Sequence, residues 1–323
     1  MHSLTRHSAL KPPRLPLGIS MSAPSTTHHH TTRPLDALAV SVVVLLCLSW
    51  GFNQVATKLA IHDIPPLIQA TIRSIGGMFI LALWCKARGI RLLTRDGTLA
   101  AGLIVGLCFS AEFILIYQGL VYTTATRAVL FLYLAPFFVV LGARIFLPVD
   151  RFSLPQWLGL GLSFAGMLLA FGIPTPALDP RQAIGDVMLV GGAMLWATTT
   201  LITKTTRLVN IASEKVMLYQ VVVSVPLLAL AAFVSGQRIT HMPSPVAMGA
   251  LAYQTFWIVS VTFVLWYALV VRYSANRLSA FTFLTPLFGV AAGHLVLGEP
   301  LTPAFAVAVA LVAGGLVLVN RAR

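Results

Sequence analysis

The sequence predicts an all-α membrane protein whose ten transmembrane helices form two inverted five-helix repeats. Three observations support this fold class. The 323 residues are 58% hydrophobic and 10% charged, with a mean hydropathy of +0.88, whereas soluble domains carry about 25% charged residues. The chain contains ten continuous apolar stretches of membrane-spanning length. The same motifs also occur twice, roughly 150 residues apart.

Each apolar stretch is about 20 residues long, which allows a helix to cross a hydrocarbon core of ~30 Å. Strands of an outer-membrane barrel would be about half as long and would alternate between polar and apolar residues, which these stretches do not. The predicted helices cover residues 37–58, 66–85, 98–119, 125–147, 155–173, 184–203, 215–234, 246–270, 277–297 and 302–320.

The repeat is recognised from two sets of matching residues. Trp50 and Lys58 recur 146 residues later as Trp196 and Lys204. The turn Thr-Ala-Thr-Arg at 124–127 recurs 150 residues later as Ser-Ala-Asn-Arg at 274–277. Because each copy contains an odd number of helices, the second copy must insert in the opposite orientation, as in many secondary transporters.

The repeats define the domain organisation. The first repeat spans 37–173 and the second spans 184–320, and a short linker joins them. Residues 1–36 are polar and rich in Pro, Ser and Thr, so we expect a disordered cytoplasmic tail. Translation could start at Met1 or at Met21, and the sequence leaves a monomer and a homodimer equally open.

The net charge of +13 reflects orientation in the membrane and not a nucleic-acid partner. Nucleic-acid binding would require the charge on one basic face, but here it is spread over the loops. With a cytoplasmic N-terminus, seventeen Lys and Arg residues fall on the cytoplasmic side and three, Arg127, Arg181 and Arg238, fall in outer loops. This satisfies the positive-inside rule, so we expect both termini in the cytoplasm.

A polar stripe runs along one face of the first helix. Asn53, Gln54 and Thr57 lie three, four and seven residues after Trp50, so the four side chains share a helical face. The equivalent stripe of the sixth helix consists of Trp196, Thr199, Thr200 and Thr203. We expect the two stripes to face each other across an aqueous substrate cavity. Hydrogen bonding between packed helices is the alternative.

Two charged residues, Arg73 and Glu112, are predicted to lie at comparable depth inside the hydrocarbon region. A charge at the bilayer centre costs about 2.5–3.5 kcal/mol, so such residues face the bundle interior and seek partners. We expect Arg73 and Glu112 to pair within the cavity. The pair is either a structural bridge or a proton-coupled contact that protonation of Glu112 breaks, which makes protons one candidate for the coupling ion.

Other repeat-equivalent residues each have two interpretations. Lys58 and Lys204 are either interfacial anchors or substrate-related residues. Tyr117 and Tyr267 either line the cavity or pack in the core. Pro136 and Pro286 are expected to kink the fourth and ninth helices, either as gating elements or as plain packing kinks.

The remaining candidates are expected to be structural. Cys47, Cys85 and Cys108 are predicted to be small core residues, and His294 a buried histidine, with a proton relay as the alternative. Asp150 and Glu299 are predicted to cap helices or hold loops, and His28 to His30 belong to the low-complexity tail. The sequence lacks His-Glu-x-x-His, Gly-x-Ser-x-Gly and Walker motifs, so we predict no enzyme, no metal and no cofactor.

Two ordered sets of motifs suggest a family. A Trp-Gly-x-Asn opening, a later lysine, a Pro-Pro pair and an arginine are matched by 50–53, Lys58, 65–66 and Arg73. A small-residue helix start, a proline and a Leu-Gly-Glu/Leu-Thr segment are matched by 274–275, Pro286 and 297–302; the first copy departs, with Leu-Pro-Val-Asp-Arg at 147–151. In these features the chain resembles the EamA family of the drug/metabolite transporter superfamily.

The resemblance covers about residues 37–320. It implies a carrier in the bacterial inner membrane, often an exporter, of amino acids, related metabolites or drugs. We therefore predict an alternating-access transporter of a small-molecule substrate across the lipid bilayer, with efflux favoured. A nucleoside, sugar or drug carrier of the same architecture and a non-transporting membrane scaffold are the alternatives. The sequence determines neither the substrate, the direction nor the coupling ion.

Overall fold

The computed structural model describes residues 35–92, 94–147, 152–173, 179–298 and 300–321. Within these residues, ten helical segments are long and apolar enough to cross a membrane, which confirms the ten predicted helices. The predicted tail up to residue 34, together with Asp150 and Glu299, lies outside the described residues.

The first repeat forms five spans, of which the fourth is divided into two helices. Its elements are α1 (Ala37–Ala60), α2 (Pro66–Ala87), α3 (Leu99–Tyr122), α4 (Ala125–Leu132), α5 (Ala135–Phe146) and α6 (Leu154–Phe171). Short polar side chains start several of these helices. Asp36 accepts a hydrogen bond of 2.7 Å from the N–H of Ala39, and Ser153 and Gln156 form a capping box at α6.

The second repeat repeats this order with one difference in its third span. Its elements are α7 (Pro180–Thr205), the short 3₁₀ helix η1 (Arg207–Asn210), α8 (Ser213–Val234), α9 (Pro245–Ala252), η2 (Tyr253–Thr262), α10 (Phe263–Arg272), α11 (Ala275–Phe281), α12 (Leu284–Leu297) and α13 (Pro303–Arg321). The segment η2 is a π-helix inside a continuous span of 28 residues. Such wider turns often occur at functional sites.

The fourth and ninth spans are each interrupted just before the matched prolines. α4 ends at Leu132 and α5 begins at Ala135, so Pro136 falls in the first turn of α5. Likewise, α12 begins at Leu284 and Pro286 falls in its first turn. Proline is tolerated there because the N–H that it lacks would have no partner within the helix.

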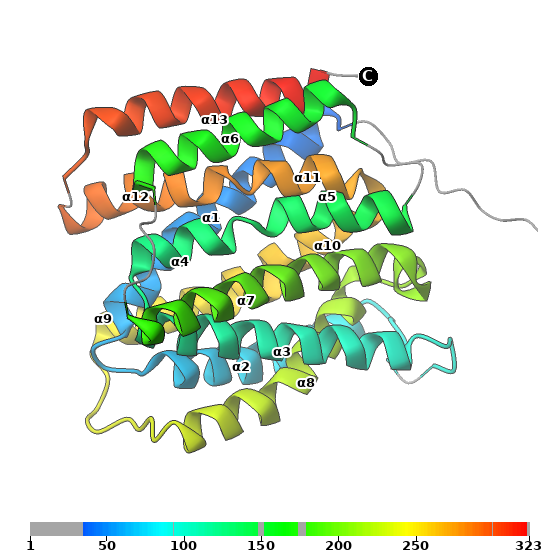
Figure 1. The fold of residues 1–323 in the computed structure, drawn as a ribbon. Coiled ribbons are helices and arrows are strands. Elements are labelled where there is room, and N and C mark those ends of the chain that lie inside the picture. Colours follow the sequence, from blue (N-terminus) through cyan, green and yellow to red (C-terminus); the bar gives the residue numbers. More distant parts are fainter. Residues whose placement is uncertain (1–34, 93, 148–151, 174–178, 299, 322–323) are drawn as a thin grey trace, which may run out of the picture. The chain divides into compact units, whose positions relative to one another are not determined.

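Equivalent helices of the two repeats run antiparallel to each other where they meet. Figure 1 shows α6 beside α13, and Gln156 donates to the Val319 carbonyl at 3.0 Å while Gly166 lies against Ala308. α2 meets α8 through a hydrogen bond of 3.0 Å between the hydroxyls of Ser74 and Ser224. The second repeat is therefore inverted relative to the first.

The remaining helix–helix contacts occur in equivalent pairs, in which the first and second repeats have swapped roles. The contact between α1 and α12 has its counterpart in the contact between α7 and α5. In the same way, the contact between α3 and α7 corresponds to the contact between the α9–η2–α10 span and α1. Each helix pair thus has a counterpart in which the two repeats have exchanged roles. This pattern is the one that a two-fold axis in the membrane plane produces.

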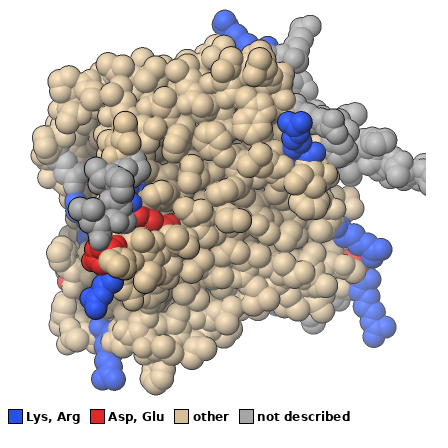
Figure 2. All heavy atoms as spheres, in the orientation of Figure 1, with Lys and Arg blue, Asp and Glu red and all other residues tan. Residues whose placement is uncertain are grey.

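The bundle has two ends, which we name for the loops that they carry. The α1–α2 end carries the turn between α1 and α2, and the α2–α3 end carries the loop between α2 and α3, to the right in Figure 1. On the face in view, Lys, Arg, Asp and Glu side chains gather toward these two ends and the wide stretch between them consists of other residues (Figure 2). Such a distribution fits a membrane-spanning unit.

Each repeat holds an aspartate near the start of the other repeat. Thr123 and Arg127, at the turn from α3 to α4, bind the carboxylate of Asp186 on α7. Thr123 Oγ1 donates at 2.8 Å and Arg127 Nε donates at 3.0 Å, while Arg127 Nη2 pairs with the second carboxylate oxygen. At the other end, the Tyr273 hydroxyl, at the turn from α10 to α11, donates to Asp36 at 2.8 Å. Arg127, placed in an outer loop by the charge pattern, is thus a buried residue.

Candidate functional site

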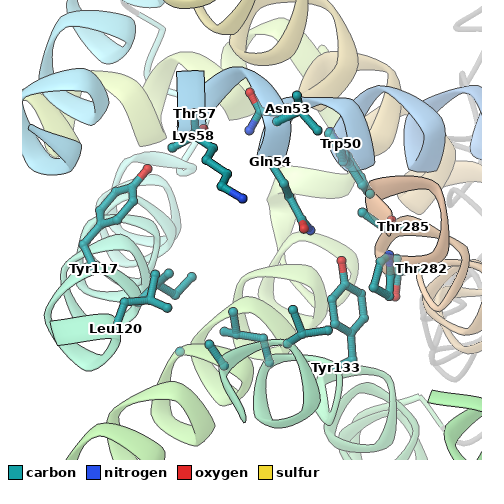
Figure 3. Close-up of a pocket in the computed structure, with 18 of the residues that line it drawn as sticks. Trp50, Asn53, Gln54, Thr57, Lys58, Tyr117, Leu120, Tyr133, Thr282 and Thr285 are labelled. Carbon is teal, nitrogen blue, oxygen red and sulfur yellow. The ribbon is translucent and has the colours of Figure 1, made fainter. Parts of the chain in front are cut away.

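A cavity of about 750 Å³ lies between helices of both repeats, within the range of about 300–1,000 Å³ common for ligand pockets. Its described polar and charged lining residues are Asn53, Gln54, Thr57, Lys58, Arg73, Glu112, Tyr117, Thr126, Tyr133, Thr282 and Thr285. Side chains from α1, α3, the α4–α5 break and the α11–α12 break point into this space (Figure 3).

The cavity opens at the α1–α2 end. Its lining residues include Ile61, directly after α1, and Leu120, in the last turn of α3. These side chains are 42% and 38% exposed although they line the cavity, so solvent reaches it from this end.

The polar stripe of α1 lies on the cavity wall. Trp50, Asn53, Gln54 and Thr57 are all lining residues, and Figure 3 shows Gln54 pointing into the space. The Oδ1 atom of Asn53 is buried without a hydrogen-bond partner among the described residues.

The equivalent stripe of α7 lies mostly outside the cavity. Trp196 is a lining residue, but Thr199 and Thr200 are 1% exposed and are not among the described lining residues. Their hydroxyls donate to the carbonyls of Leu195 and Trp196 within α7. The expectation that both threonines line the cavity is therefore wrong for this conformation.

The two repeat-equivalent tyrosines differ in the same way. Tyr117 lines the cavity from α3, whereas Tyr267 on α10 is 3% exposed and is not among the described lining residues. The Tyr267 hydroxyl donates to Gln220 Oε1 at 2.9 Å. Of the two interpretations of Tyr267, core packing applies in this conformation and the cavity position does not, since its hydroxyl is used in a contact with α8.

Three tryptophans close the cavity toward the α2–α3 end. Trp266 on α10 is 1% exposed, and its ring lies 5.5 Å from Trp50 and 5.3 Å from Trp196 between centroids. Trp50 is also fixed by a hydrogen bond of 2.9 Å from its Nε1 to Thr262 Oγ1. The repeat-equivalent Trp50 and Trp196 thus both pack against the ring of Trp266.

This asymmetry explains why one stripe is exposed and its counterpart is not. The two repeats share one architecture, but the α1 and α3 ends form an open vestibule while the equivalent α7 and α10 ends are packed together. An inverted repeat that is open at one end must place equivalent residues in unlike surroundings.

Arg73 and Glu112 both line the cavity but do not form the expected direct ion pair. Within the described residues, no hydrogen bond or ion pair joins the two side chains. The Arg73 guanidinium instead lies 4.2 Å from the ring centroid of Phe113, and its Nε and Nη2 atoms are buried without a hydrogen-bond partner. The aromatic face next to Glu112 in sequence takes the place that the carboxylate was expected to fill.

Sequence reasoning missed several lining residues near the helix breaks. Tyr133, Thr282 and Thr285 lie within four residues before the matched prolines and point into the cavity (Figure 3). Pro286 is itself a lining residue, whereas Pro136 is buried and is not among the described ones. Backbone hydrogen bonds that span three residues close both breaks, such as Leu134 N–H to the Phe131 carbonyl and Thr285 N–H to the Thr282 carbonyl. The matched prolines were the sequence signal that could have indicated these residues.

The minor candidates separate into buried and exposed residues. Cys47 and Cys85 are buried and Cys108 is partly buried, and Cys47 Sγ donates to the Phe281 carbonyl at 3.3 Å. His294 is exposed near the end of α12, so the expectation of a buried histidine is wrong. The neighbouring Leu295 is 82% exposed, which shows that α12 turns this face away from the core.

A family model described as "EamA-like transporter family" matches residues 37–172 and 183–321. The chain belongs to the EamA-like transporter family. This EamA-like chain is 28% identical over 291 residues to a protein of Salmonella typhimurium named "Probable amino-acid metabolite efflux pump", covering 86% of this chain and 92% of that protein. It is 25% identical over 287 residues to "Uncharacterized transporter YvbV" of Bacillus subtilis, covering 86% and 90%.

A solved crystal structure shares the fold of this EamA-like chain. It superposes with a TM-score of 0.74 at 20% identity, over 87% of this chain and 96% of the other. The family assignment makes the protein a multi-pass membrane transporter with a small-molecule substrate.

Proposed function

We propose that the protein exports small zwitterionic metabolites, such as amino acids or related compounds, by alternating access. The observation that carries this proposal is the charge composition of the cavity. Its described lining residues include two cations, Lys58 and Arg73, and one carboxylate, Glu112. A zwitterion carries both complementary charges, and amides and hydroxyls on the same walls provide neutral hydrogen bonds.

The aromatic lining supports a substrate with an apolar part. Trp50, Trp196, Phe113 and Phe263 contribute ring surface to the cavity. Apolar and aromatic walls with a few polar groups are typical of sites that bind small organic molecules. The two relatives named as probable amino-acid metabolite efflux pumps agree with this class, at 28% and 26% identity.

Direction and location follow as part of the proposal. With the N-terminus in the cytoplasm of a bacterial cell, α1 runs outward, so the α1–α2 end faces the periplasm and the structure represents an outward-open state. The protein would then reside in the inner membrane and release its substrate from this state.

Reconstituted flux tests the proposed substrate class. Liposomes containing the full chain should accumulate amino acids in a counterflow assay, and a panel of nucleosides, sugars and cationic dyes should exchange more slowly. Thr57→Ala should reduce the flux. Thr198→Ala, on α7 and not among the described lining residues, should not. Preferential exchange of a nucleoside or dye would favour the alternative carrier, and no flux of any compound would favour a scaffold.

We further propose that Glu112 couples the flux to protons. It is 7% exposed on the cavity wall of a membrane-spanning helix, and carboxylates inside the membrane often serve as proton relays in transporters. Transport by the wild-type chain should depend on a proton gradient, and Glu112→Gln should abolish that dependence while preserving exchange of substrate. Gradient-driven transport by Glu112→Gln equal to that of the wild type would contradict this role.

A further inference from the structure

Lys204 makes a specific contact at the closed end of the bundle. From the last turn of α7, its Nζ donates to the Val270 carbonyl at 2.9 Å and also to the Tyr273 carbonyl. These acceptors lie at the C-terminus of α10, where helix carbonyls lack partners within the helix. A cation is favourable at this position because the helix dipole is negative there. The lysine is 9% exposed and ties α7 to α10.

The first repeat contains the same parts at the open end. Lys58 lies in the last turn of α1, and the C-terminus of α3 carries Leu120 and Thr123 where α10 carries Val270 and Tyr273, at a shift of 150. The two turns are built alike. The N–H of Thr123 donates to the Gly119 carbonyl at 3.1 Å, and the N–H of Tyr273 donates to the Leu269 carbonyl at 2.9 Å.

In this conformation the two sets of parts differ in their separation. Figure 3 shows Lys58 and Leu120 on facing walls of the cavity. Leu120 is 38% exposed, whereas the equivalent Val270 is completely buried beneath the Lys204 contact. The open vestibule therefore lies between Lys58 and the C-terminus of α3, whereas the equivalent Lys204 and the C-terminus of α10 are joined at the other end.

We propose that Lys58 and Lys204 are alternating latches that determine which end of the transporter is closed. In the present state, Lys204 holds the C-terminus of α10 and keeps the α2–α3 end closed. In the opposite state, Lys58 donates to the carbonyls of Leu120 and Thr123, and Lys204 leaves Val270 and Tyr273. The inference rests on the proposed alternating-access function. It makes Lys204 a positioning residue and gives Lys58, a cavity-lining cation in the present state, a positioning role in the opposite state.

The physical basis is the exchange of equivalent contacts. A two-fold-related architecture that opens at its other end must place the first repeat in the surroundings that the second now occupies. A charge-assisted contact present in one state alone biases the equilibrium by its full differential energy. Loss of one such hydrogen bond changes the ratio of the two states by roughly tenfold or more.

The test uses the full chain in membrane vesicles and a pair of equivalent reporter cysteines. Cys47, Cys85 and Cys108 are replaced by alanine, and either Thr126→Cys or Asn276→Cys is introduced. Thr126 is exposed at the cavity wall, and the equivalent Asn276 is completely buried in the closed half. Labelling rates with a membrane-impermeant maleimide, applied from each side, then measure how far each end is open without requiring a substrate.

The two latches should shift these rates in opposite directions. Lys204→Met should increase labelling at Asn276→Cys by roughly tenfold and decrease it at Thr126→Cys. Lys58→Met should decrease labelling at Asn276→Cys and increase it at Thr126→Cys. Lys204→Arg, which keeps a charged donor, should resemble the wild type, and so should Lys86→Met, which removes an exposed lysine at the end of α2.

Shifts in the same direction, or no shift in either variant, would overturn the proposal, because a merely structural lysine would not produce opposite effects. If Lys204→Met does not fold, Lys58→Met alone decides, since its side chain is exposed in the open half. The outcome is also separable from the proposed substrate. Opposite labelling shifts with no amino-acid flux would support the latches and reject the substrate class.

Discussion

The close contact between α1 and α12 gives a sharp test of how the cavity wall is built. A Cβ atom added to Gly51 would lie 2.7 Å from the main-chain nitrogen of Gly289 and 2.7 Å from the carbonyl oxygen of Thr285. Both neighbours are backbone atoms of α12, so neither can turn aside as a side chain can. Ordinary contact begins at 3.4 Å. Gly51→Ala must therefore move α1 and α12 apart by about 0.7 Å, which is 3.4 minus 2.7.

Two other glycines provide matched controls. A Cβ on Gly289, across the same interface, would lie 3.0 Å from Gln54 Oε1, the end of an exposed side chain that can move. A Cβ on Gly161, within α6, would meet nothing within 4 Å. Replacing a helical glycine by alanine gains about 0.8–1.0 kcal/mol of helix propensity when no clash opposes it, so Gly161→Ala should raise the melting temperature.

Overpacking costs about 1–3 kcal/mol and exceeds this gain at Gly51. In detergent, we expect Gly51→Ala to lower the melting temperature, Gly289→Ala to change it little and Gly161→Ala to raise it. Thermal unfolding followed by tryptophan fluorescence measures all three. Gly51→Ala should also slow transport, because α1 carries the polar stripe of the cavity. A Gly51→Ala variant as stable as Gly161→Ala would show that the helices are not in this close contact.

Three further predictions concern the ends of the bundle and the sealed stripe. Asp186→Ala removes the carboxylate that Arg127 binds and should destabilise the protein by about 3–5 kcal/mol; the double variant with Arg127→Met should recover most of the loss in a thermal unfolding cycle. Hydrogen bonds from Ser244 and His241 lower the pKa of Asp63 to about 2. The folded pKa is depressed below the unfolded value of about 3.9. The contribution of this contact to stability is therefore complete above pH ~4 and is lost as the pH falls through the folded pKa. Proteolysis of the loop 235–244 should accelerate only below pH ~4, and Asp63→Asn should remove this pH dependence. Finally, cysteines at Thr199 and Thr200 should react slowly with maleimide in the present state and faster in any variant that opens the α2–α3 end, and equal rates with a cysteine at Asn53 would contradict the asymmetry.

The sequence predicted the helices well because their length and apolarity are local properties. The largest boundary error is at the sixth helix, predicted from residue 184 and observed from Pro180. The missed turn contains Arg181 and Gln182, which do not resemble a membrane span. The structure tolerates Arg181 because its side chain is exposed at the start of α7. It tolerates the buried Asp186, one turn further on, because Arg127 of the other repeat neutralises it, a contact that hydropathy alone cannot reveal.

The cavity residues were predicted unequally for a different reason. Helical periodicity correctly placed Asn53, Gln54 and Thr57 on one face, and it placed Thr199 and Thr200 on an equivalent face just as well. Which of the two faces lines the open cavity depends on how the repeats are tilted against each other. Because the repeats are related by a two-fold axis, the sequence is compatible with both tilts and does not indicate which one is adopted. The contact of Arg73 with Phe113 was also missed, because an aromatic ring can replace a carboxylate as the neighbour of a guanidinium.

Comparison of the two ends separates contacts that must persist from contacts that must change. If exchange of the repeats converts one state into the other, a contact found at both ends in one state is found at both ends in the other. A hydrogen bond to an aspartate occurs at both ends, since Thr123 binds Asp186 at one end and the equivalent Tyr273 binds Asp36 at the other. The aspartates themselves are offset by four residues, about one helical turn, in the alignment that pairs Trp50 with Trp196. These contacts can serve as fixed joints between the repeats. The lysine contact exists at one end and its parts are held apart at the other, so it belongs to the contacts that change. Aspartate contacts that persist at both ends, together with a lysine contact made at one end at a time, allow the two repeats to stay joined while the cavity opens to the other side of the membrane.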